Sequence, residues 1–502
     1  MATAKKAAAK KPASKKAAPK KPAHKARKPE APTSASLAAF YTSAITELDR
    51  SLYLRSGTAT MPTPVSSGLL TMDWVMAGGA NACFTQISGA EASGKSSSAM
   101  MVLASAVKAK VPLIIYIDAE GSLSAEFAEN VLGHFDMGNV FRTGRALYYD
   151  TNIIEDVAGL ISGILRKMPE KTYLPEEKTW AYLVPKASKK HLPLLAALEK
   201  QGLKPDKKLS ASGKSWVVPT TYSGLEAVIV VDSWASMIPR DLDETEGDLK
   251  GGMAANARAF SREIPRFQGK LKGRGVALWS VNQLRQTPGV MYGDPLRESG
   301  GTALQYASSA RARMFSRAVP QGTDRDPDAA GLAIEPSVTG GKKAKDRYAY
   351  KQIVNTKNKY GRPLLKASLR IWVSDEDGKP RGFCPVHDTL VYLQSTGQIS
   401  GPLKKLQFRF LRSAAIPEAV LALEKRTFTY LELKALILHD YLRKTRPKAA
   451  AAAATHLGKF LDKGAVPLRA SLFKQLASDP AIWSTASAEP EIETDDDTVE
   501  DE

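Results

Sequence analysis

Short apolar, β-rich runs alternate with helical patterns between Pro62 and about Val373. This alternation predicts an α/β fold in which a mostly parallel central sheet is flanked by helices. The runs predicted to form strands are Cys83–Ile87, Leu113–Ile117, Ala227–Val231, Val276–Val281, Ala310–Phe315, Tyr350–Asn355 and Ser368–Val373.

The segments around this core have patterns of their own. Apolar positions recur every three or four residues in 35–61, which predicts an N-terminal oligomerisation helix ahead of a core that spans 62–375. Residues 168–222 interrupt the core with many lysines and prolines, so we expect an insertion there. Helical patterns beyond the core predict a smaller, mainly helical C-terminal domain over 376–488.

The net charge of the chain indicates which kind of partner it binds. The 502 residues carry a net charge of +19, which indicates a polyanionic partner, most often nucleic acid. The first 28 residues hold eleven Lys/Arg and no acid, whereas 489–502 hold nine Asp/Glu and no base. Removing these eleven positive and nine negative charges from +19 leaves +17 on the remainder. Both tails, 1–34 and 489–502, are predicted to be disordered, and a solubilising or targeting role for the basic one stays open.

Other classes of protein fit poorly. No apolar run reaches the roughly 18 residues of a membrane span, and the N-terminus lacks the apolar region of a secretory signal. Two cysteines, Cys83 and Cys384, are too few for a disulfide framework and favour a reducing compartment. We therefore expect a cytoplasmic protein without a membrane partner.

The segment Gly89–Ser96, GAEASGKS, matches the phosphate-binding loop G-x-x-x-x-G-K-[ST] between a predicted strand and a predicted helix. Its glycines allow backbone N–H groups to surround phosphates, and the helix N-terminus adds a positive dipole end. Lys95 would reach the β- and γ-phosphates, and the Ser96 hydroxyl would ligate Mg²⁺. The residues predicted to hold the nucleotide phosphates are Gly89, Ala90, Glu91, Ala92, Ser93, Gly94, Lys95, Ser96 and Ser97.

Two further strands end in acid. Asp232 closes the run VIVVD, where it would hold Mg²⁺ directly or through water. Glu120 comes just after the run IIYID, where a carboxylate can orient and deprotonate an attacking water. Either acid alone is more often a helix cap or a salt-bridge partner. The upstream phosphate-binding loop favours the functional interpretation, because these strand ends should open onto one crevice.

Residues 282–301, NQLRQTPGVMYGDPLRESGG, come directly after the apolar run Val276–Val281. They include four glycines, two prolines and an arginine near each end. This composition cannot pack as a core element, so it predicts a long, mobile and partly basic loop.

These motifs together resemble the bacterial RecA recombinase family. GAEASGKS, YIDAEGSLSAEFA, VIVVDS, VNQLRQTPGVMYGDP with SGGTALQYASSARAR, and TKNKYGRP occur in the order and at roughly the spacing of that family. SSGLLTMDWVMAGG, upstream, is similar to the family's entry to its core. The resemblance covers about residues 62–373 apart from the insertion at 168–222. It implies a RecA-like P-loop NTPase core and a DNA-dependent ATPase that uses ATP and Mg²⁺.

The resemblance also assigns residues around the nucleotide. It makes Glu120 the catalytic glutamate and Gln283 the amide that senses the γ-phosphate. Phe127 takes the place of an aromatic against adenine, and Ser124 takes that of an acid in the same pocket.

A subunit interface is implied as well. Lys357 and Lys359 match lysines that reach the nucleotide of the neighbouring subunit, and Tyr306 matches an aromatic at that interface. ATP would then lie between protomers of a helical filament, because a heterologous contact that does not close propagates. A solvated strand edge is the alternative for the two lysines.

Two loops would bind DNA by the same resemblance, one after the strand that ends at Asp232 and one within 282–301. Apolar residues of the second loop can wedge between bases while arginine meets phosphate, which gives sequence-tolerant binding. The spacing before the first loop's contacts departs from the family pattern. The predicted DNA contacts are Met253, Arg258, Arg285, Gly289, Val290, Met291, Tyr292, Gly293, Arg297, Gly300 and Gly301.

Other departures predict a divergent member, which we expect to be encoded by a bacteriophage. Leu296 stands where the family commonly has an acid, and Arg297 where a small hydroxylated residue is usual. The loop thereby becomes more basic, which would either tighten DNA binding or weaken its coupling to ATP hydrolysis. The acidic tail resembles the family's tail and would restrain duplex binding.

The function expected from the resemblance is homologous pairing and strand exchange by filaments on single-stranded DNA, in recombination, repair and the SOS response. Expected partners are single- and double-stranded DNA, further copies of the chain, and single-strand-binding and loader proteins in the nucleoid of a bacterial or phage-infected cell. Two alternatives stay open. One is a helicase or motor ATPase with the same core, and the other is a DNA-packaging protein that acts through its basic tail.

Overall fold

The computed structural model describes most of the predicted core and part of the predicted C-terminal domain. The predicted N-terminal helix (apart from its last two residues) and both charged tails lie outside the described residues. The described residues are 60–132, 136–186, 189–210, 214–243, 252–286, 295–317, 348–372, 382–402, 405–413, 415–442, 450 and 466–484.

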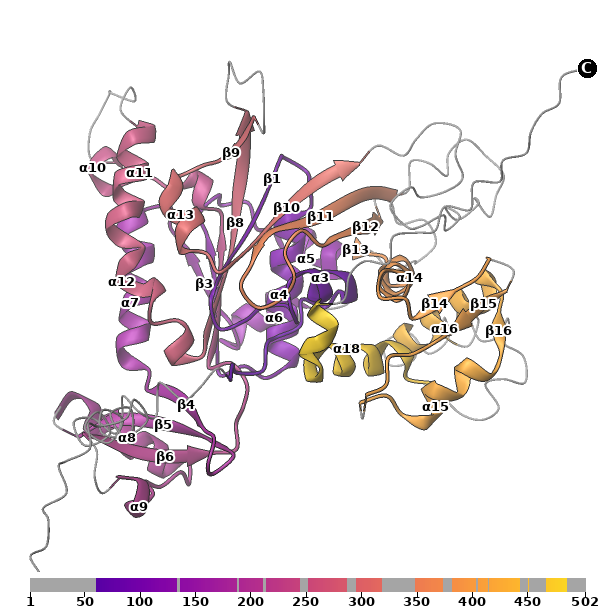
Figure 1. Ribbon diagram of the computed structural model, residues 1–502. Coiled ribbons are helices and arrows are strands. Elements are labelled where there is room, and N and C mark those ends of the chain that lie inside the picture. Colours follow the sequence, from indigo (N-terminus) through magenta and orange to yellow (C-terminus); the bar gives the residue numbers. More distant parts are fainter. Residues whose placement is uncertain are drawn as a thin grey trace, which may run out of the picture. The chain divides into compact units, whose positions relative to one another are not determined.

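A ten-stranded sheet forms the centre of the described chain (Figure 1). The order across it is β13-β12-β11-β10-β1-β8-β7-β2-β3, and β9 pairs with β8. The strands from β10 to β3 in this order run parallel, whereas β9, β11, β12 and β13 are antiparallel to their neighbours. The predicted α/β class is confirmed. Its strands are β1 (Phe84–Gly89), β2 (Leu113–Asp118), β3 (Leu147–Asp150), β7 (Ala227–Asp232), β8 (Val276–Gln286), β9 (Leu296–Glu298), β10 (Ala310–Arg317), β11 (Tyr348–Asn358), β12 (Lys366–Trp372) and β13 (Gly382–Phe383).

All of the runs predicted as strands form strands, with two notable differences. Strand β8 does not stop at Val281 but continues to Gln286, because its last three residues pair with β9. Strand β3 was not predicted. It is four residues long and exposed throughout, so it lacks the apolar pattern of a buried strand.

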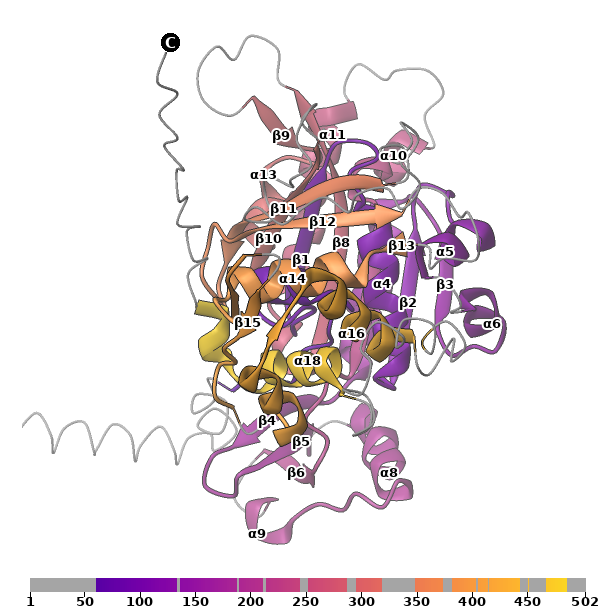
Figure 2. The ribbon, with the colours of Figure 1, turned by 90° about the vertical axis from the view of Figure 1, so that its right-hand side faces the viewer.

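Helices cover both faces of the sheet (Figures 1 and 2). In β7, Val228 and Val230 face one apolar cluster, while Ile229 and Val231 face the other. A parallel strand buried on both faces reads as an unbroken apolar run for this reason. The first cluster includes residues of α3, α4 and α5, and the second includes residues of α7, α11 and α12. The helices of this region are α3 (Leu70–Val75), α4 (Lys95–Lys108), α5 (Ala125–Leu132), α6 (Met137–Arg142), α7 (Ile154–Lys167), α10 (Arg240–Asp243), α11 (Gly252–Glu263), α12 (Pro265–Gln268) and α13 (Thr302–Ala307).

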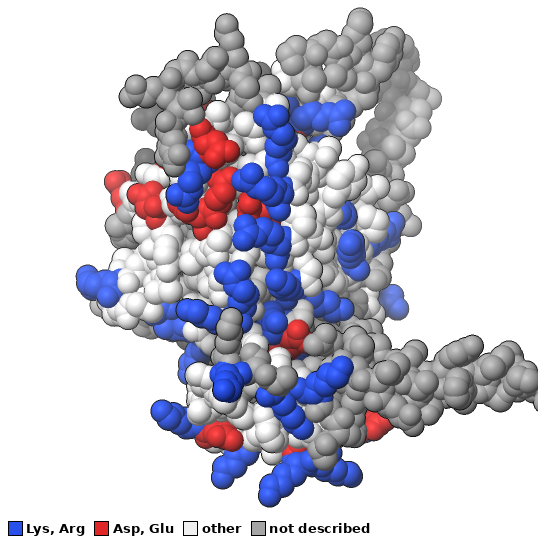
Figure 3. All heavy atoms as spheres, turned by 90° about the vertical axis from the view of Figure 1, so that its left-hand side faces the viewer, with Lys and Arg blue, Asp and Glu red and all other residues white. Residues whose placement is uncertain are grey.

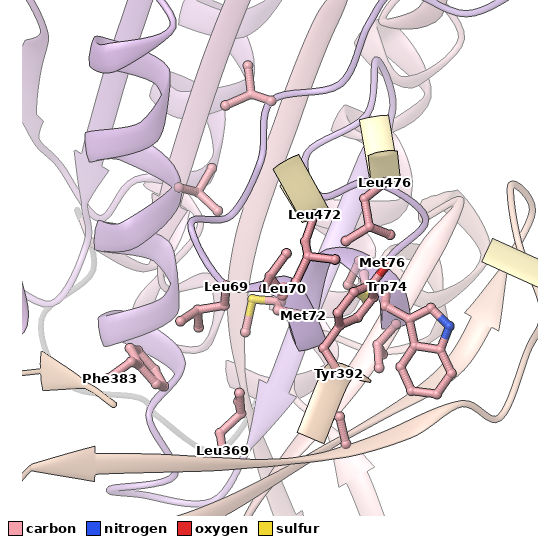
Figure 4. Packing of buried hydrophobic residues seen from close by; sticks show 14 of the residues in the cluster. Leu69, Leu70, Met72, Trp74, Met76, Leu369, Phe383, Tyr392, Leu472 and Leu476 are labelled. Atoms are coloured by element: carbon pink, nitrogen blue, oxygen red, sulfur yellow. The ribbon is translucent and has the colours of Figure 1, made fainter. Parts of the chain in front are cut away.

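The C-terminal elements share the first apolar cluster. Figure 4 shows Leu472 and Leu476 of α18 close to Trp74 and Met76, at the end of α3, and to Tyr392 of α14. Besides helices, this region contains a small antiparallel sheet that the sequence pattern did not predict. The predicted boundary near residue 376 stays a prediction. The elements are α14 (Pro385–Ser395), β14 (Ile399–Ser400), β15 (Leu406–Phe408), α15 (Glu418–Leu421), β16 (Thr427–Phe428), α16 (Tyr430–Leu442) and α18 (Leu468–Ser478).

A buried carboxylate fixes the start of α3 to the C-terminal region. Asp388 of α14 accepts hydrogen bonds from the backbone N–H groups of Leu70 and Thr71, both at 3.0 Å, and from the Thr71 hydroxyl at 2.6 Å. Arg469 of α18 forms an ion pair of 2.7 Å with the same carboxylate. The orphan N–H groups of a helix start are therefore satisfied by a residue more than 300 positions away.

Residues 168–222 contain a second, smaller antiparallel sheet in the order β4-β5-β6. Lys171 of this sheet donates to Glu226 Oε1 and to the Gly224 carbonyl, both at 2.7 Å, immediately before β7 begins. The Lys171 side chain is fully buried and lies 4.3 Å from the Tyr222 ring centre. A buried ion pair thus holds the insertion to the core. Its elements are β4 (Glu170–Leu174), β5 (Thr179–Pro185), α8 (Leu192–Lys200), α9 (Lys207–Ser210) and β6 (Ser215–Thr220).

Candidate nucleotide and DNA site

The GAEASGKS segment forms a loop between the end of β1 and the start of α4. Gly94 precedes the helix with φ +94°, a conformation that favours glycine. A Cβ at Gly89 would collide with the Met314 carbonyl and the Ser93 side chain. The sequence therefore folds here into a tight turn that opens a helix N-terminus, which is the geometry that binds phosphate.

Lys95 is the first residue of α4, and its side chain reaches back to this loop. Its Nζ donates to the Ala90 carbonyl at 2.6 Å, with the Ser93 hydroxyl at 3.5 Å. Burial lowers the pKa of Lys95, while the nearby carboxylates of Asp232 and Glu120 raise it. The structure thus brings the two predicted acids close enough to act on the loop lysine.

Sheet register explains why these residues meet. Gly89 at the end of β1 is level with Gln283 on β8, and Asp118 at the end of β2 is level with Asp232 on β7. The order β1-β8-β7-β2 then places the carboxyl ends of four parallel strands at one edge. Ligands of open α/β sheets bind at this kind of edge.

Asp232 is buried and has one oxygen without a hydrogen-bond partner. Its Oδ2 accepts from the Tyr116 hydroxyl at 2.9 Å, whereas its Oδ1 accepts no hydrogen bond. Burial raises the pKa of Asp232 to about 6, and the Ser96 hydroxyl acts in the opposite direction. An orphaned carboxylate oxygen next to a hydroxyl fits a hard cation such as Mg²⁺. The described residues contain no group of three or more His, Cys, Asp or Glu side chains around a common point, so phosphate and water would complete the shell.

Glu120 is the centre of a small polar network. Its Oε1 accepts from the Ser233 hydroxyl at 2.5 Å, the Ser236 hydroxyl at 3.2 Å and the Gln283 side-chain amide at 3.3 Å. The sequence predicted Glu120 and Gln283 separately, and the structure joins them directly. The two serines were missed, because a serine after a strand has no distinctive pattern.

Asp118, the last residue of β2, has a structural role. It is buried, its Oδ1 accepts from the backbone N–H of Glu120 at 3.1 Å, and its Oδ2 accepts from Leu123 N at 2.9 Å and from the Tyr148 hydroxyl at 3.1 Å. These bonds close the turn that carries Glu120. Asp118 therefore orients the candidate catalytic acid and was not singled out by the sequence.

A second lysine lies on the phosphate-binding loop and was also missed. Lys351 on β11 donates from Nζ to the Ala92 carbonyl at 2.6 Å and to the Ser316 hydroxyl at 2.9 Å. Its charge lowers the pKa of Lys95, so the two ammonium groups are close. Lys351 lies more than 250 residues after Ala92 in the sequence, so no local motif connects it with the phosphate-binding loop.

The predicted second DNA loop begins from an ordered hairpin stem. Strand β8 pairs with β9 so that Arg285 lies opposite Arg297, and both side chains are exposed. Like charges directly opposite each other destabilise a sheet unless an anion lies between them. The loop residues Gly289, Val290, Met291, Tyr292 and Gly293 lie outside the described residues.

The base of this hairpin is tied to the nucleotide strand. Glu298 of β9 is buried and receives two hydrogen bonds from Arg311 Nη2, both at 2.7 Å. The Ser88 hydroxyl, one residue before the phosphate-binding loop, donates to the same carboxylate at 3.1 Å. The base of the hairpin and the strand that leads into the phosphate-binding loop therefore share one buried carboxylate.

Gly300 and Gly301 belong to a packed turn rather than to an open loop. A Cβ at Gly300 would lie 2.8 Å from the Phe260 ring, and a Cβ at Gly301 would lie 2.9 Å from Ala257. Both glycines thus press against α11. Met253 and Arg258 were predicted within the first loop, but both lie on α11 itself, and Arg258 is exposed.

The predicted adenine contacts lie on α5. Ser124 Oγ accepts from the backbone N–H of Phe127 at 3.0 Å and so caps the start of that helix. Phe127 packs against the first apolar cluster. Capping explains the serine structurally, and its adenine role stays a prediction.

The predicted subunit-interface residues gather near α13, away from the phosphate-binding loop. Lys357 donates to the carbonyls of Gln305 and Tyr306 at 3.2 and 3.3 Å, which satisfies the end of that helix. Lys359 is exposed, and the Tyr306 side chain is 77% exposed. None of the three contacts the nucleotide loop of its own chain through a hydrogen bond among the described residues.

None of the described helices has the length and apolar character of a membrane span. The fold and the strand-edge geometry define an α/β P-loop protein with a RecA-like core. A family model described as the RecA N-terminal domain matches residues 218–345. That range contains Asp232, Gln283 and the second predicted loop, and most of it lies beyond the insertion.

Similar proteins include "Protein RecA" of Mycolicibacterium smegmatis, which is 29% identical over 221 residues, covering 39% of this chain and 62% of that protein. "Protein RecA" of Herpetosiphon aurantiacus is 30% identical over 177 residues, covering 35% and 43%. "Protein RecA" of Colwellia psychrerythraea is 40% identical over 92 residues, covering 18% and 26%. The chain spans less than two thirds of these relatives. The predicted resemblance to the RecA family is confirmed as a sequence similarity over these parts of the chain.

Proposed function

We propose that this protein is a DNA-dependent ATPase that forms helical filaments on single-stranded DNA and catalyses homologous pairing and strand exchange. The observation that carries the proposal is the contact between the Gln283 amide and Glu120 Oε1 at 3.3 Å. Gln283 and Arg285 lie two residues apart on β8, so one strand joins the candidate catalytic acid to the stem of the candidate DNA loop. The similarity to proteins named RecA supports the same function.

In this proposal the phosphate-binding loop and Lys95 hold the nucleotide, and Ser96 with Asp232 would hold Mg²⁺. The ion would neutralise phosphate charge when bound. Glu120 orients and deprotonates the attacking water. Gln283 contacts the γ-phosphate, so the position of β8, which carries Gln283, depends on whether that phosphate is present. ATP then acts as a switch, because binding favours the extended filament and hydrolysis releases DNA.

Filament formation requires two different surfaces on each copy. The exposed side chains of Leu147, Tyr148 and Tyr149 belong to edge strand β3, and exposed Tyr306 belongs to α13. An edge strand offers unpaired backbone groups to a partner. The exposed side chains of β3 on one copy and of α13 on the next could therefore form a head-to-tail contact. Lys357 and Lys359 would then lie near the α13 side of that contact.

ATP turnover with and without single-stranded DNA, combined with electron microscopy of the same mixtures, tests the proposal. We expect turnover to rise on DNA and open helical filaments to form. Lys95→Ala should abolish both, whereas Lys108→Ala at the other end of α4 should retain them. Closed rings would favour a helicase, and coating of DNA without turnover would favour a packaging protein.

A further inference from the structure

Basic side chains form a regular series on one face of the core. Arg258, Arg262, Arg266 and Lys270 succeed one another at intervals of four residues along α11, α12 and the turn after them, and all are exposed. Ile264 between the two helices keeps helical dihedral angles, so the series stays on one side. Figure 3 shows Lys and Arg gathered in a column that runs down this face.

The acids that pair with the column are Glu155 and Glu263 in its upper half and Glu170, which lines the groove beside Arg274, at its lower end. Glu155 and Glu263 pair with Arg262 at 2.5 and 3.0 Å, and Glu263 also pairs with Arg266. Below them, Lys270 and Lys272 form no ion pair with an acidic side chain of the described chain. The lower half therefore carries the excess of positive charge.

The lower half of the column leads into a groove of about 340 Å³ between the insertion and the core. Lys270, Lys272 and Arg274 line it from the core side, and Lys171 and Trp180 line it from β4 and β5. Lys171 is fixed by its buried ion pair, and Arg274 lies 3.4 Å from Glu170. Ion pairs thus fix the side chains of Lys171 and Arg274 in the lining, while Lys270 and Lys272 are exposed at the edge of the groove.

Glycines keep the floor of this groove open. A Cβ at Gly269 or Gly273 would meet no atom within 4 Å. A bulky ligand can therefore approach the backbone at Gly269 and Gly273, on either side of the segment that carries Lys270 and Lys272. The insertion adds charge to the same region, since residues 168–222 contain ten lysines and five acids.

The aromatic side chain that lines the groove, Trp180, is only 8% exposed, and this bears on the kind of nucleic acid that the described part of this face can bind. Single-stranded DNA is normally bound on aromatic side chains as well as on positive charge. None of the exposed large apolar side chains of the described chain lines the groove or belongs to α11 or α12. They are Leu147, Tyr148, Tyr149, Leu192, Tyr306, Leu364 and Tyr441. From Arg258 to Lys270 the series spans about 18 Å at 1.5 Å per helical residue, which is about five base-pair steps of a duplex.

We propose that the basic track, defined as Arg258, Arg262, Arg266, Lys270, Lys272 and Arg274, binds double-stranded DNA by its phosphates and guides it into the groove beside the insertion. The track begins on α11 at Arg258, a predicted DNA contact, and ends far from the hairpin of Arg285 and Arg297. The inference rests on the proposed function only for the identity of the nucleic acid. It gives the insertion a role, because the groove exists only where the smaller sheet meets the core.

The test is a double charge reversal, Lys270→Glu with Lys272→Glu, in the full chain. Binding to a labelled 30-base-pair duplex and to a 30-nucleotide single strand is measured by fluorescence anisotropy over a range of salt. We expect duplex affinity to fall at least ten-fold and the salt slope to fall by about 2, at about 0.9 per phosphate contact. Single-strand affinity and DNA-stimulated ATP turnover should stay within about two-fold.

A matched variant, Lys405→Glu with Lys474→Glu, changes the net charge equally at exposed positions of the C-terminal region. An equal loss of duplex affinity in this control, or an equal loss for both kinds of DNA in the track variant, would overturn the proposal. Lys270→Gln with Lys272→Gln, checked by circular dichroism, should give an intermediate loss. The binding is measured without ATP and also in Lys95→Ala, so that a failure of the proposed ATPase function is distinguished from a failure of the track.

Discussion

At the residue scale, three donors meet on one carboxylate oxygen of Glu120. Ser233, Ser236 and Gln283 all approach Oε1. Two of these donors come after β7 and the third lies on β8, so the position of Glu120 depends on both strands. A side chain held in this way can respond to whatever occupies the phosphate-binding loop and to whatever moves the hairpin stem.

Glu120→Gln should reduce DNA-stimulated ATP turnover by at least about 100-fold, because a general base contributes about 10² to 10⁴ to such a rate. Nucleotide binding, measured with a fluorescent ATP analogue, should change little, since the amide oxygen keeps the acceptor position. Glu126→Gln on nearby α5 is the control and should retain turnover. Loss of analogue binding in Glu120→Gln would show that Glu120 serves binding instead.

Lys351→Met should weaken ATP binding by about ten-fold or more, since hydrogen bonds to charged groups contribute about 1.5 to 3 kcal/mol. The reason is its position on the phosphate-binding loop, where Nζ already contacts the Ala92 carbonyl. Titration calorimetry with a non-hydrolysable analogue measures the effect. Lys366→Met, which removes an exposed lysine on the adjacent strand, should leave affinity unchanged, and an equal loss there would exclude a specific role for Lys351.

At the scale of elements, the turn after β9 and helix α11 fit closely together. Gly300 has φ +87° and faces Phe260, which packs edge-on against Trp234 with ring centres 5.6 Å apart. The stem of one predicted DNA loop therefore rests on the helix at the end of the other. Close packing of this kind couples the two elements, since neither shifts without the other.

Gly300→Ala should lower the free energy of unfolding by about 1 to 3 kcal/mol, the usual cost of overpacking a core, with left-handed backbone strain acting in the same direction. Urea denaturation measures the change. Gly159→Ala is a matched control in α7, where an added Cβ meets no atom within 4 Å. It should be stabilising by about 0.5 to 1 kcal/mol, and a destabilised control would argue against this account of the packing.

The contact of α14 with β12 should make stability depend on pH. Burial and the nearby Arg370 lower the pKa of His387 well below 6.5, and its ring contacts the Ser368 hydroxyl at 2.7 Å and the Tyr350 ring. Below about pH 6.5 the unfolded chain gains a proton that the folded chain does not take up. The contribution of His387 to stability should therefore fall as the pH falls, by up to about 1.4 kcal/mol per pH unit. The buried carboxyl groups of Asp73 and Asp232, whose pKa values are raised to about 7 and about 6, act in the opposite direction.

Urea denaturation between pH 5 and pH 7.5 measures this dependence. His387→Gln should remove the contribution of His387 from the measured slope, because glutamine can keep the bond to Ser368 without titrating. An unchanged slope in His387→Gln would show that other groups cause the dependence.

At the scale of the whole molecule, positive charge is distributed over the basic tail, the body and the insertion. Deleting residues 1–28 should weaken duplex binding and flatten its salt dependence, because fewer counterions are released. Anisotropy titrations at several salt concentrations measure both quantities. Strand exchange should persist at low salt, and its disappearance there would show that the tail serves pairing rather than simple attraction.

Much of the architecture could be predicted from the sequence. The strands that carry Asp232 and Gln283 are apolar runs long enough to identify, and the loop at Gly89–Ser96 is defined by local spacing alone. Strand β3 was not predicted because it is exposed throughout and has no apolar face. The strands β14, β15 and β16 were not predicted because two or three residues are too few to show a period. The full length of β8 depends on pairing with β9, which local pattern does not include.

The motifs, the charge of the tails and the chemistry expected at each strand end can all be read from the chain before it folds, because backbone conformation and side-chain type are local properties. Which of these groups meet depends on the folded arrangement. Folding places Lys351 on the phosphate-binding loop, Glu298 against Arg311 and Ser88, and Asp388 at the start of α3. It also aligns Lys270 and Lys272 with a groove beside the insertion. Such contacts arise from strand order and from packing between segments far apart in the chain, and no short stretch of sequence encodes either.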